Sequence, residues 1–148
     1  MSSLNDAKGE IQRADHLLFV TLKYTRTIDV IKSVIARLAN AYDNVIIYAL
    51  EILKKKKKIK QIPLTPVSRA ELLGDVNKKD IIILDSLNIY FFLRKVAKAD
   101  YTKKEEFRKN VTLTVMHKGE VIEVNIKTLE EYYEKTKEFI DYVNEKFK

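Results

Sequence analysis

The chain has 148 residues, 46% of them apolar, which suffices for one hydrophobic core, so the sequence predicts a single domain over residues 1–148. It contains no cysteine, which excludes disulfides, thiol catalysis and thiolate metal sites. No apolar run approaches the roughly 18–20 residues of a membrane span, and residues 1–10 are too polar for a secretory signal. We therefore expect a cytoplasmic protein that makes no membrane contact.

Two helices are predicted in the first part of the chain. Residues 5–26 carry apolar side chains at spacings of three and four, which is the period of a helix that faces a core. Thr27 is placed to cap a second helix, with Asp29 in its first turn. This second helix, over residues 27–58, has one continuous apolar stripe and would be on the order of 45 Å long.

A connector and a short helix are expected next. Pro63 and Pro66 exclude a helix from residues 59–65, because proline has no backbone N–H to donate. Thr65 followed by Pro66 is the signature of an N-cap and a first helical turn. The sequence therefore predicts a short helix that begins at Pro66 and stops at Gly74.

Two further helices are predicted before the sequence period changes. Residues 80–99 are apolar on almost every face, which is typical of a helix in the middle of a core. The β-branched residues at 81–83 leave a strand start open, and the length of the segment favours the helix. Thr102 with Glu105 forms a capping box that would open a short helix ending near Asn110.

From residue 111 onward, apolar residues alternate with polar ones, which predicts strands. A two-residue turn at Lys118–Gly119 would pair His117 with Glu120. The same register brings three apolar pairs onto one face: Val111/Ile126, Leu113/Val124 and Val115/Ile122. This face must be buried, either on the helices or on another subunit, and the opposite face would point to solvent with Thr112, Thr114, Glu123 and Asn125.

The last predicted helix, over residues 128–147, opens with a second capping box formed by Thr128 and Glu131. The fold class is therefore mainly α. It consists of an up-and-down helical bundle over about residues 5–110, a C-terminal β-hairpin over about 111–126, and this final helix.

The sequence offers little material for catalysis. Its two histidines, His16 and His117, lie on different predicted elements with no metal-ligand spacing, and no cysteine can join them. The three glycines are too far apart to form a phosphate-binding loop. We expect no metal site, no cofactor and no catalytic residue.

The net charge of +7 comes almost entirely from one basic run, because six of the positive charges belong to Lys54, Lys55, Lys56, Lys57, Lys58 and Lys60. These lysines could bind the phosphates of a nucleic acid by charge and counterion release. They also lie at a helix C-terminus, where cations complement the helix dipole. No aromatic residue lies within the run, so the binding would be weak and indifferent to base sequence.

A second group of charges surrounds the predicted short helix at 102–110. Arg94 follows an apolar run, and Arg108 lies at a helix end just before a strand. Either arginine could be half-buried and paired with Glu105 or Glu106. These four residues are candidates for a structural ion pair or for a ligand site.

Three segments carry a resemblance to a known family: Ala14–Leu18, Tyr24–Leu38, and Tyr90–Val111 with its Glu106-Phe107-Arg108. Together they resemble small archaeal helical-bundle proteins of the HEPN superfamily, over most of residues 10–126. The chain is also rich in Lys, Glu and Ile, which resembles thermophile usage. The resemblance implies an up-and-down four-helix bundle.

Active HEPN proteins are metal-independent ribonucleases, and their motif is an Arg, a polar residue, and then about four to six residues to a His on one helix. The nearest match here is Arg108 with His117, and eight residues lie between them. His117 also lies at the end of a predicted strand. The catalytic pair therefore does not transfer, and the resemblance implies a non-catalytic member that binds nucleotides, nucleic acid or a protein.

These observations favour a non-enzymatic binding module, which works as a homo-oligomer or with a protein partner. The alternative is a HEPN-like protein that binds or cleaves RNA through the basic run and Arg108, with His117 as the second catalytic residue.

Overall fold

The computed structural model describes residues 3–104 and 106–148, and it confirms the mainly α-helical fold class. The helical segments are α1 (Ser3–His16), the π-helical η1 (Leu17–Thr21), α2 (Leu22–Tyr24), α3 (Ile28–Lys55), α4 (Pro66–Val76), α5 (Ile81–Lys98) and α6 (Ile126–Lys146). The strands are β1 (Asp100–Lys104), β2 (Thr112–His117) and β3 (Glu120–Asn125), which form an antiparallel sheet in that order.

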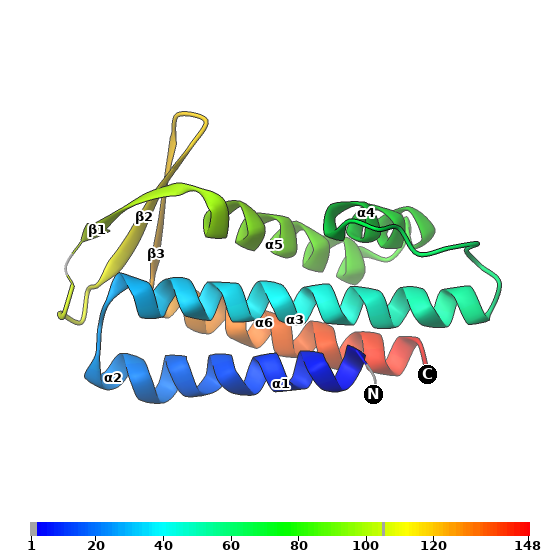
Figure 1. The fold of residues 1–148 in the computed structure, drawn as a ribbon, viewed down its shortest axis with the longest axis horizontal. Helices are drawn as coiled ribbons and strands as arrows, with labels where there is room; N and C mark the ends of the chain where they lie inside the picture. The colour runs from blue at the N-terminus through cyan, green and yellow to red at the C-terminus, as the bar shows by residue number, and fades with distance from the viewer. Residues whose placement is uncertain (1–2, 105) are drawn as a thin grey trace.

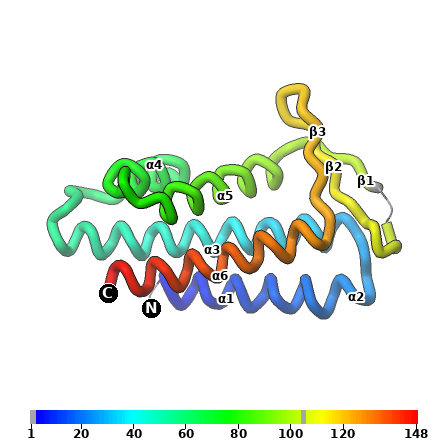
Figure 2. Tube along the Cα trace, turned by 180° about the vertical axis from the view of Figure 1, so that it is seen from behind, coloured from blue at the N-terminus to red at the C-terminus, as the bar shows by residue number. Residues whose placement is uncertain are grey.

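Helix α3 is the central helix of the bundle, because it contacts α1, α5 and α6 along its length. The sheet covers one end of the bundle, beside the start of α3, and α4 lies over the other end, near both chain termini (Figures 1 and 2). In the core the ring of Tyr42 stacks on Phe139 with 5.1 Å between centroids, and it contacts Tyr90 at 5.8 Å. Three long helices thus meet at one aromatic cluster.

The first predicted helix is present, and it contains a π-helical turn that the sequence pattern did not reveal. Leu18 in η1 and Leu22 in α2 keep the buried face of the helix continuous through this turn. The ring of Phe19 packs edge-on against Tyr133 of α6, with 5.3 Å between centroids. The Tyr133 hydroxyl also donates a 2.5 Å hydrogen bond to Asp15. Tyr133 of α6 therefore contacts both the turn and the helix that precedes it.

The predicted N-caps of α3 and α4 are both confirmed. Thr27 Oγ1 accepts a hydrogen bond from the Val30 N–H at 3.4 Å. Thr65 Oγ1 accepts one from the Ser68 N–H at 3.2 Å, and Pro66 occupies the first helical position. These side chains satisfy backbone donors that a helix N-terminus leaves without an intrahelical partner.

The C-terminus of α3 is closed by backbone hydrogen bonds alone, three residues before the predicted end of the helix. Lys57 adopts a left-handed conformation with φ of 59°. Its N–H donates to the Lys54 carbonyl at 3.0 Å, and the Lys58 N–H donates to the Leu53 carbonyl at 2.9 Å. This is a Schellman motif, in which a lysine stands at the position that glycine usually takes.

The prediction that Gly74 ends α4 is wrong, because the helix continues to Val76. A Cβ at Gly74 would lie 3.2 Å from Leu87 Cδ1, so this glycine marks a close approach between α4 and α5. The segment from 81 to 83 is helical, and Asp80 caps it by accepting a 3.1 Å hydrogen bond from the Ile83 N–H.

The predicted short helix over residues 102–110 is wrong, because Asp100–Lys104 form strand β1 instead. Tyr101 pairs with Val115 in an antiparallel ladder, so β1 covers the edge of β2 that the hairpin leaves open. The pairing depends on β2, which lies further along the chain, so the local sequence around Thr102 indicated a helix cap instead of a strand. Glu105, one member of the predicted capping box, lies outside the described residues.

The hairpin register is confirmed at the turn and at two of the three predicted apolar pairs. His117 lies opposite Glu120, and the pairs Val115/Ile122 and Leu113/Val124 follow. The third pair, Val111 with Ile126, is wrong, because the ladder ends at Thr112/Asn125 and the helix begins at Ile126. The inner face lies against α3 and α6, and its buried residues are Val111, Leu113, Val115 and Val124.

The predicted capping box of the last helix is also wrong. Asn125 is the N-cap of α6, and its Oδ1 accepts hydrogen bonds from the N–H and the hydroxyl of Thr128, both at 2.9 Å. The helix therefore starts at Ile126, two residues before the predicted start. One asparagine ends the last strand and opens the last helix without a linker.

Candidate functional site

The lysine run lies at the end of the bundle that is opposite to the sheet (Figure 1). All six lysines are exposed, in the last turn of α3 and in the residues that follow it: Lys54, Lys55, Lys56, Lys57, Lys58 and Lys60. We call this region the lysine end. It has the charge to attract a polyanion, and within the described residues it presents no aromatic side chain beside the lysines.

Arg94 is half-buried on α5, as predicted, and its interactions are with residues of the bundle. Its Nη1 lies 3.4 Å from the Tyr90 hydroxyl, which donates a short hydrogen bond to Asp43. Burial raises the pKa of Asp43 above its ordinary value, although Tyr90 and the charge of Arg94 act against the shift. Burial, together with the bond to Asp43, also raises the pKa of Tyr90. This cluster joins α3 to α5.

Glu106 closes the N-terminus of α3 from a distant part of the chain. Its Oε2 accepts a 2.9 Å hydrogen bond from the Ile28 N–H, and the next N–H, of Phe107, donates to the Arg26 carbonyl at 2.7 Å. Lys103 lies 4.0 Å from the same carboxylate. Within the described residues, Glu106 forms no ion pair with Arg94 or Arg108. Glu106 instead forms a clamp on the junction between α2 and α3, and the predicted pairing with Glu105 lies outside the described residues.

This clamp presents an aromatic ring to solvent. Phe107 has φ of 67°, which is rare for a bulky side chain, and its side chain is 72% exposed. Tyr24, two residues before the clamped Arg26, is 85% exposed. Basic residues flank both rings, and we call this set the sheet-end surface: Lys23, Tyr24, Arg26, Lys103, Phe107, Arg108 and Lys109.

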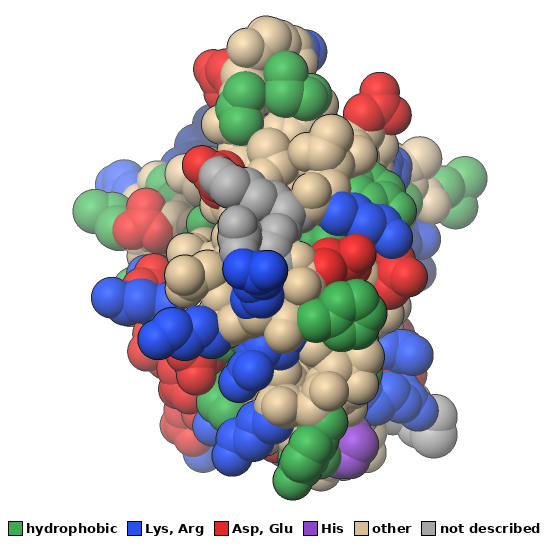
Figure 3. All heavy atoms as spheres, turned by 90° about the vertical axis from the view of Figure 1, so that its left-hand side faces the viewer, with side chains coloured by type: hydrophobic (Ala, Val, Ile, Leu, Met, Phe, Trp, Pro, Cys, Tyr) green, Lys and Arg blue, Asp and Glu red, His purple; other side chains and the backbone are tan. Residues whose placement is uncertain are grey.

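Figure 3 looks directly at this end of the molecule, where exposed hydrophobic side chains lie among lysine and arginine side chains, with acidic side chains between them. Arg108 is exposed here, in the loop before β2. His117 lies at the far end of β2, so the six-residue strand, about 20 Å long, separates the two. Neither Tyr24 nor Phe107 was predicted as a binding residue from the sequence. Each is an aromatic residue that belongs to no apolar stripe and is next to Lys or Arg in the chain, which is the signal that could have identified it.

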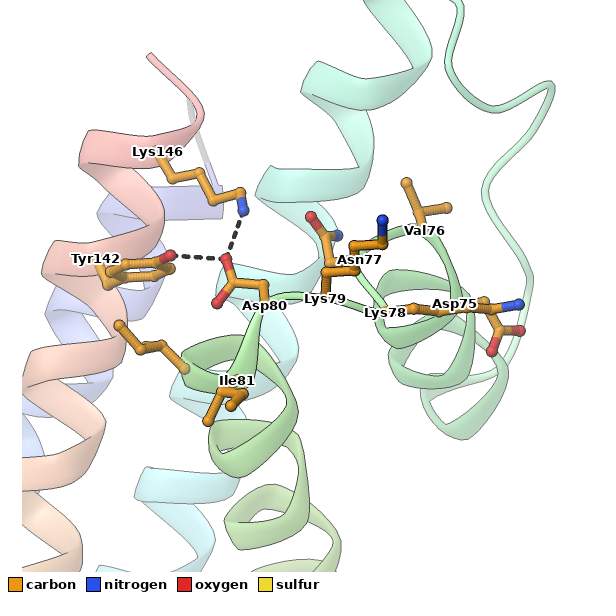
Figure 4. Close-up of a pocket in the computed structure, with 10 residues that line it drawn as sticks. Asp75, Val76, Asn77, Lys78, Lys79, Asp80, Ile81, Tyr142 and Lys146 are labelled. Carbon is orange, nitrogen blue, oxygen red and sulfur yellow. Dashed lines mark hydrogen bonds and ion pairs between the residues drawn. The ribbon is translucent and has the colours of Figure 1, made fainter.

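A pocket of about 790 Å³ lies between the start of α5 and the end of α6 (Figure 4). Inside it, the Asp80 carboxylate accepts hydrogen bonds from the Tyr142 hydroxyl at 2.6 Å and from Lys146. Burial acts to raise the pKa of Asp80, but the bonds from Lys146, Tyr142 and the Ile83 N–H together lower it. One oxygen of this carboxylate thus joins α5 to α6, and the other caps α5.

No group of three or more histidines and carboxylates that could hold a metal ion exists among the described residues. No helix in the described part of the chain has the length and apolarity to span a membrane. No protein-family model, curated protein or solved structure matches the chain. The resemblance to the HEPN superfamily therefore stays a prediction.

Proposed function

We propose that the protein is a non-enzymatic binding module, and that its sheet-end surface binds single-stranded nucleic acid. The observation that carries the proposal is the placement of two exposed rings, Tyr24 and Phe107, among lysine and arginine side chains. Proteins that bind single strands combine a positive surface with aromatic rings on which bases stack. The lysine end offers only the first of these two features.

The backbone of Phe107 supports this reading. A left-handed conformation costs a residue with a Cβ about 1–2 kcal/mol, and the hydrogen bonds of Glu106 and Phe107 to the α2–α3 junction offset that cost. A ring that only filled the core would be buried, whereas this one points outward from a fixed backbone. The fixed position reduces the entropy lost when a base stacks on it.

The lysine end would act as a separate and weaker contact. Helix α3 has 28 residues, so it sets the two ends about 40 Å apart. A 12-mer with stacked bases, at about 3.4 Å per nucleotide, would have to extend to contact both. Cleavage of RNA by Arg108 with His117, the alternative function, is disfavoured because β2 separates the two side chains. Both residues would have to approach the same phosphate.

Fluorescence anisotropy with a labelled single-stranded 12-mer tests the proposal. Tyr24→Ala and Phe107→Asn should each weaken binding by about 1–3 kcal/mol, because each removes one stacking platform. Asparagine tolerates the left-handed conformation, so the second variant keeps the backbone of the clamp. Leu64→Ala is the matched control, because Leu64 is also exposed but lies in the connector near the lysine end.

The salt dependence of the same binding separates the two ends. Replacing Lys54–Lys58 by Gln should leave most of the affinity of a short oligonucleotide, and it should lower the salt dependence measured with a longer strand, since each contact contributes about −0.7 to the log–log slope. If the Gln variant abolished binding of the 12-mer while Tyr24→Ala and Phe107→Asn did not weaken it, the site would be the lysine end and the proposal would be wrong.

A second candidate function, self-association, is favoured by the hairpin. It projects beyond the helices in Figure 1, and β3 is an edge strand whose backbone can pair with another strand. Met116 and Val121 lie opposite each other on its outer face and are exposed. Light scattering after gel filtration tests this candidate, with Val121→Lys expected to convert a dimer to a monomer.

A further inference from the structure

A groove on the side of the bundle lies between α1 and α3, apart from the sheet-end surface. It has a volume of about 440 Å³, and its lining residues are Gly9, Gln12, Arg13, His16, Leu17 and Arg37. Pockets for small ligands begin at about 300 Å³, so the groove can hold a small molecule. The side chains of Arg13, His16 and Arg37 can carry a positive charge, and none of the six lining residues is acidic.

A buried carboxylate holds two arginines of this groove in place. The Glu10 side chain is only 11% exposed, and it accepts hydrogen bonds from Arg13 Nη1 at 2.7 Å and from Arg37 Nη1 at 3.3 Å. The amide of Asn40 donates a third bond at 3.3 Å. The side chains of Arg13 and Arg37 are 62% and 41% exposed. Glu10 therefore holds one nitrogen of each guanidinium group and leaves much of each side chain accessible to solvent.

Among the residues that line and hold the groove, positive charge exceeds negative charge. One carboxylate faces two guanidinium groups, and His16 adds a further cation when it is protonated. Within the described residues, Glu10 engages Nη1 of Arg13 and Arg37, while Nε and Nη2 of both have no hydrogen bond. A structural ion pair would need one arginine; the second supplies donors for another anion, and guanidinium groups match phosphate geometry.

Two further features of the first helical segment lie at the groove. Gly9 lies inside the helix, where glycine is unfavourable, and a Cβ there would meet no atom within 4 Å. Packing therefore does not require a glycine at this position. The π-helical turn η1 starts at Leu17, on the rim of the groove, and π turns occur frequently at functional sites.

We infer that this groove binds the phosphate group of a small phosphoester, through the guanidinium groups of Arg13 and Arg37. The inference goes beyond the nucleic-acid surface at the sheet end and does not depend on it. Replacing either arginine would leave Glu10 buried with fewer partners and could unfold the protein. Gly9 offers a cleaner test, because any side chain added there enters open space.

The experiment is a titration of the full-length, ¹⁵N-labelled protein with inorganic pyrophosphate, followed by backbone amide shifts. We expect saturable shifts at residues 9–17 and 37–40. Gly9→Glu places a carboxylate in the groove, within reach of Arg13 one turn along the helix, and should weaken binding by about tenfold or more. Gly9→Ala, the matched control, should change the affinity by less than about threefold.

Three results would overturn the inference. Shifts that do not saturate, or that follow the lysine run, would show general attraction of anions. An unchanged affinity in Gly9→Glu would place the binding elsewhere. Displacement of pyrophosphate by the single-stranded 12-mer would assign the groove to the nucleic-acid backbone instead of a small phosphoester.

Discussion

The two ends of helix α3 are both basic, yet they are built in different ways. At the sheet end, its first N–H groups are bound by Thr27 and by Glu106, which lies 78 residues away from Ile28 in the chain. At the lysine end, its last carbonyls are bound by the backbone N–H groups of Lys56, Lys57 and Lys58. The two ends therefore share positive charge but differ in construction: Glu106 ties the start of α3 to a distant segment that carries the exposed Phe107 ring, and within the described residues no such ring lies beside the lysines.

The largest effect is expected from disrupting the inner face of the sheet, which packs on the bundle at the sheet end. Leu113→Asp should lower the free energy of unfolding by several kcal/mol, because it buries an unpaired charge and removes an apolar contact. Thr114→Lys, on the opposite face of the same strand, should cost less than about 1 kcal/mol. Denaturant melts measure both, and equal effects on the two faces would contradict the register.

Removing the long-range cap comes next. Glu106→Ala should destabilise the protein by about 1–2 kcal/mol, since it leaves the Ile28 N–H without its acceptor. It should also weaken binding of the 12-mer, because one of the two hydrogen bonds that hold Glu106 and Phe107 on the α2–α3 junction is lost. Glu130→Ala, an exposed residue on α6, is the control. A loss of stability without any loss of binding would show that the clamp does not position the ring.

The contact that Asp80 makes with α6, near the lysine end, depends on pH. The lowered pKa of Asp80 means that its charged form stabilises the fold above the ordinary pKa, and that this stabilisation is lost as the pH falls through the lowered value. Asp80→Asn should therefore cost about 1–2 kcal/mol at neutral pH and progressively less below about pH 4. Unfolding measured across this range, with the exposed Asp75→Asn as control, tests the sign. A constant difference would contradict it.

The smallest expected effect is a gain in stability at the lysine end. Lys57→Gly relieves the left-handed conformation in the Schellman motif, and it should raise the free energy of unfolding by up to about 1 kcal/mol. Lys56→Gly, one residue earlier and outside that conformation, should give no gain. A loss of stability in Lys57→Gly would mean that the lysine side chain itself stabilises this end.

Local signals predicted the parts of the fold that depend on neighbouring residues. The caps at Thr27 and Thr65 and the register through Val115/Ile122 were readable because both partners lie within a few residues or across one turn. Strand β1 was not, because its partner β2 begins beyond a loop, and the segment from Thr102 resembles a helix start until that pairing is known.

The candidate sites were harder to predict for the same reason. Arg108 was singled out, whereas Tyr24 lies more than eighty residues earlier in the chain, and the hydrogen bond from the Phe107 N–H to the Arg26 carbonyl joins the two segments. The groove needs Arg13 and Arg37 on two helices, brought together by a carboxylate whose burial no periodicity shows. Composition indicated where charge is concentrated, and the fold decided which charges share a surface.

The π-helical turn η1 has a consequence for how the length of this protein can vary. A residue deleted inside an α-helix turns everything beyond it by about 100°, so that buried side chains leave the core. A π turn already contains one residue more than an α turn. Loss of the exposed Val20 would convert η1 to ordinary helix and leave the buried faces before and after it aligned. We therefore expect natural insertions and deletions in the first helix to concentrate at residues 17–21.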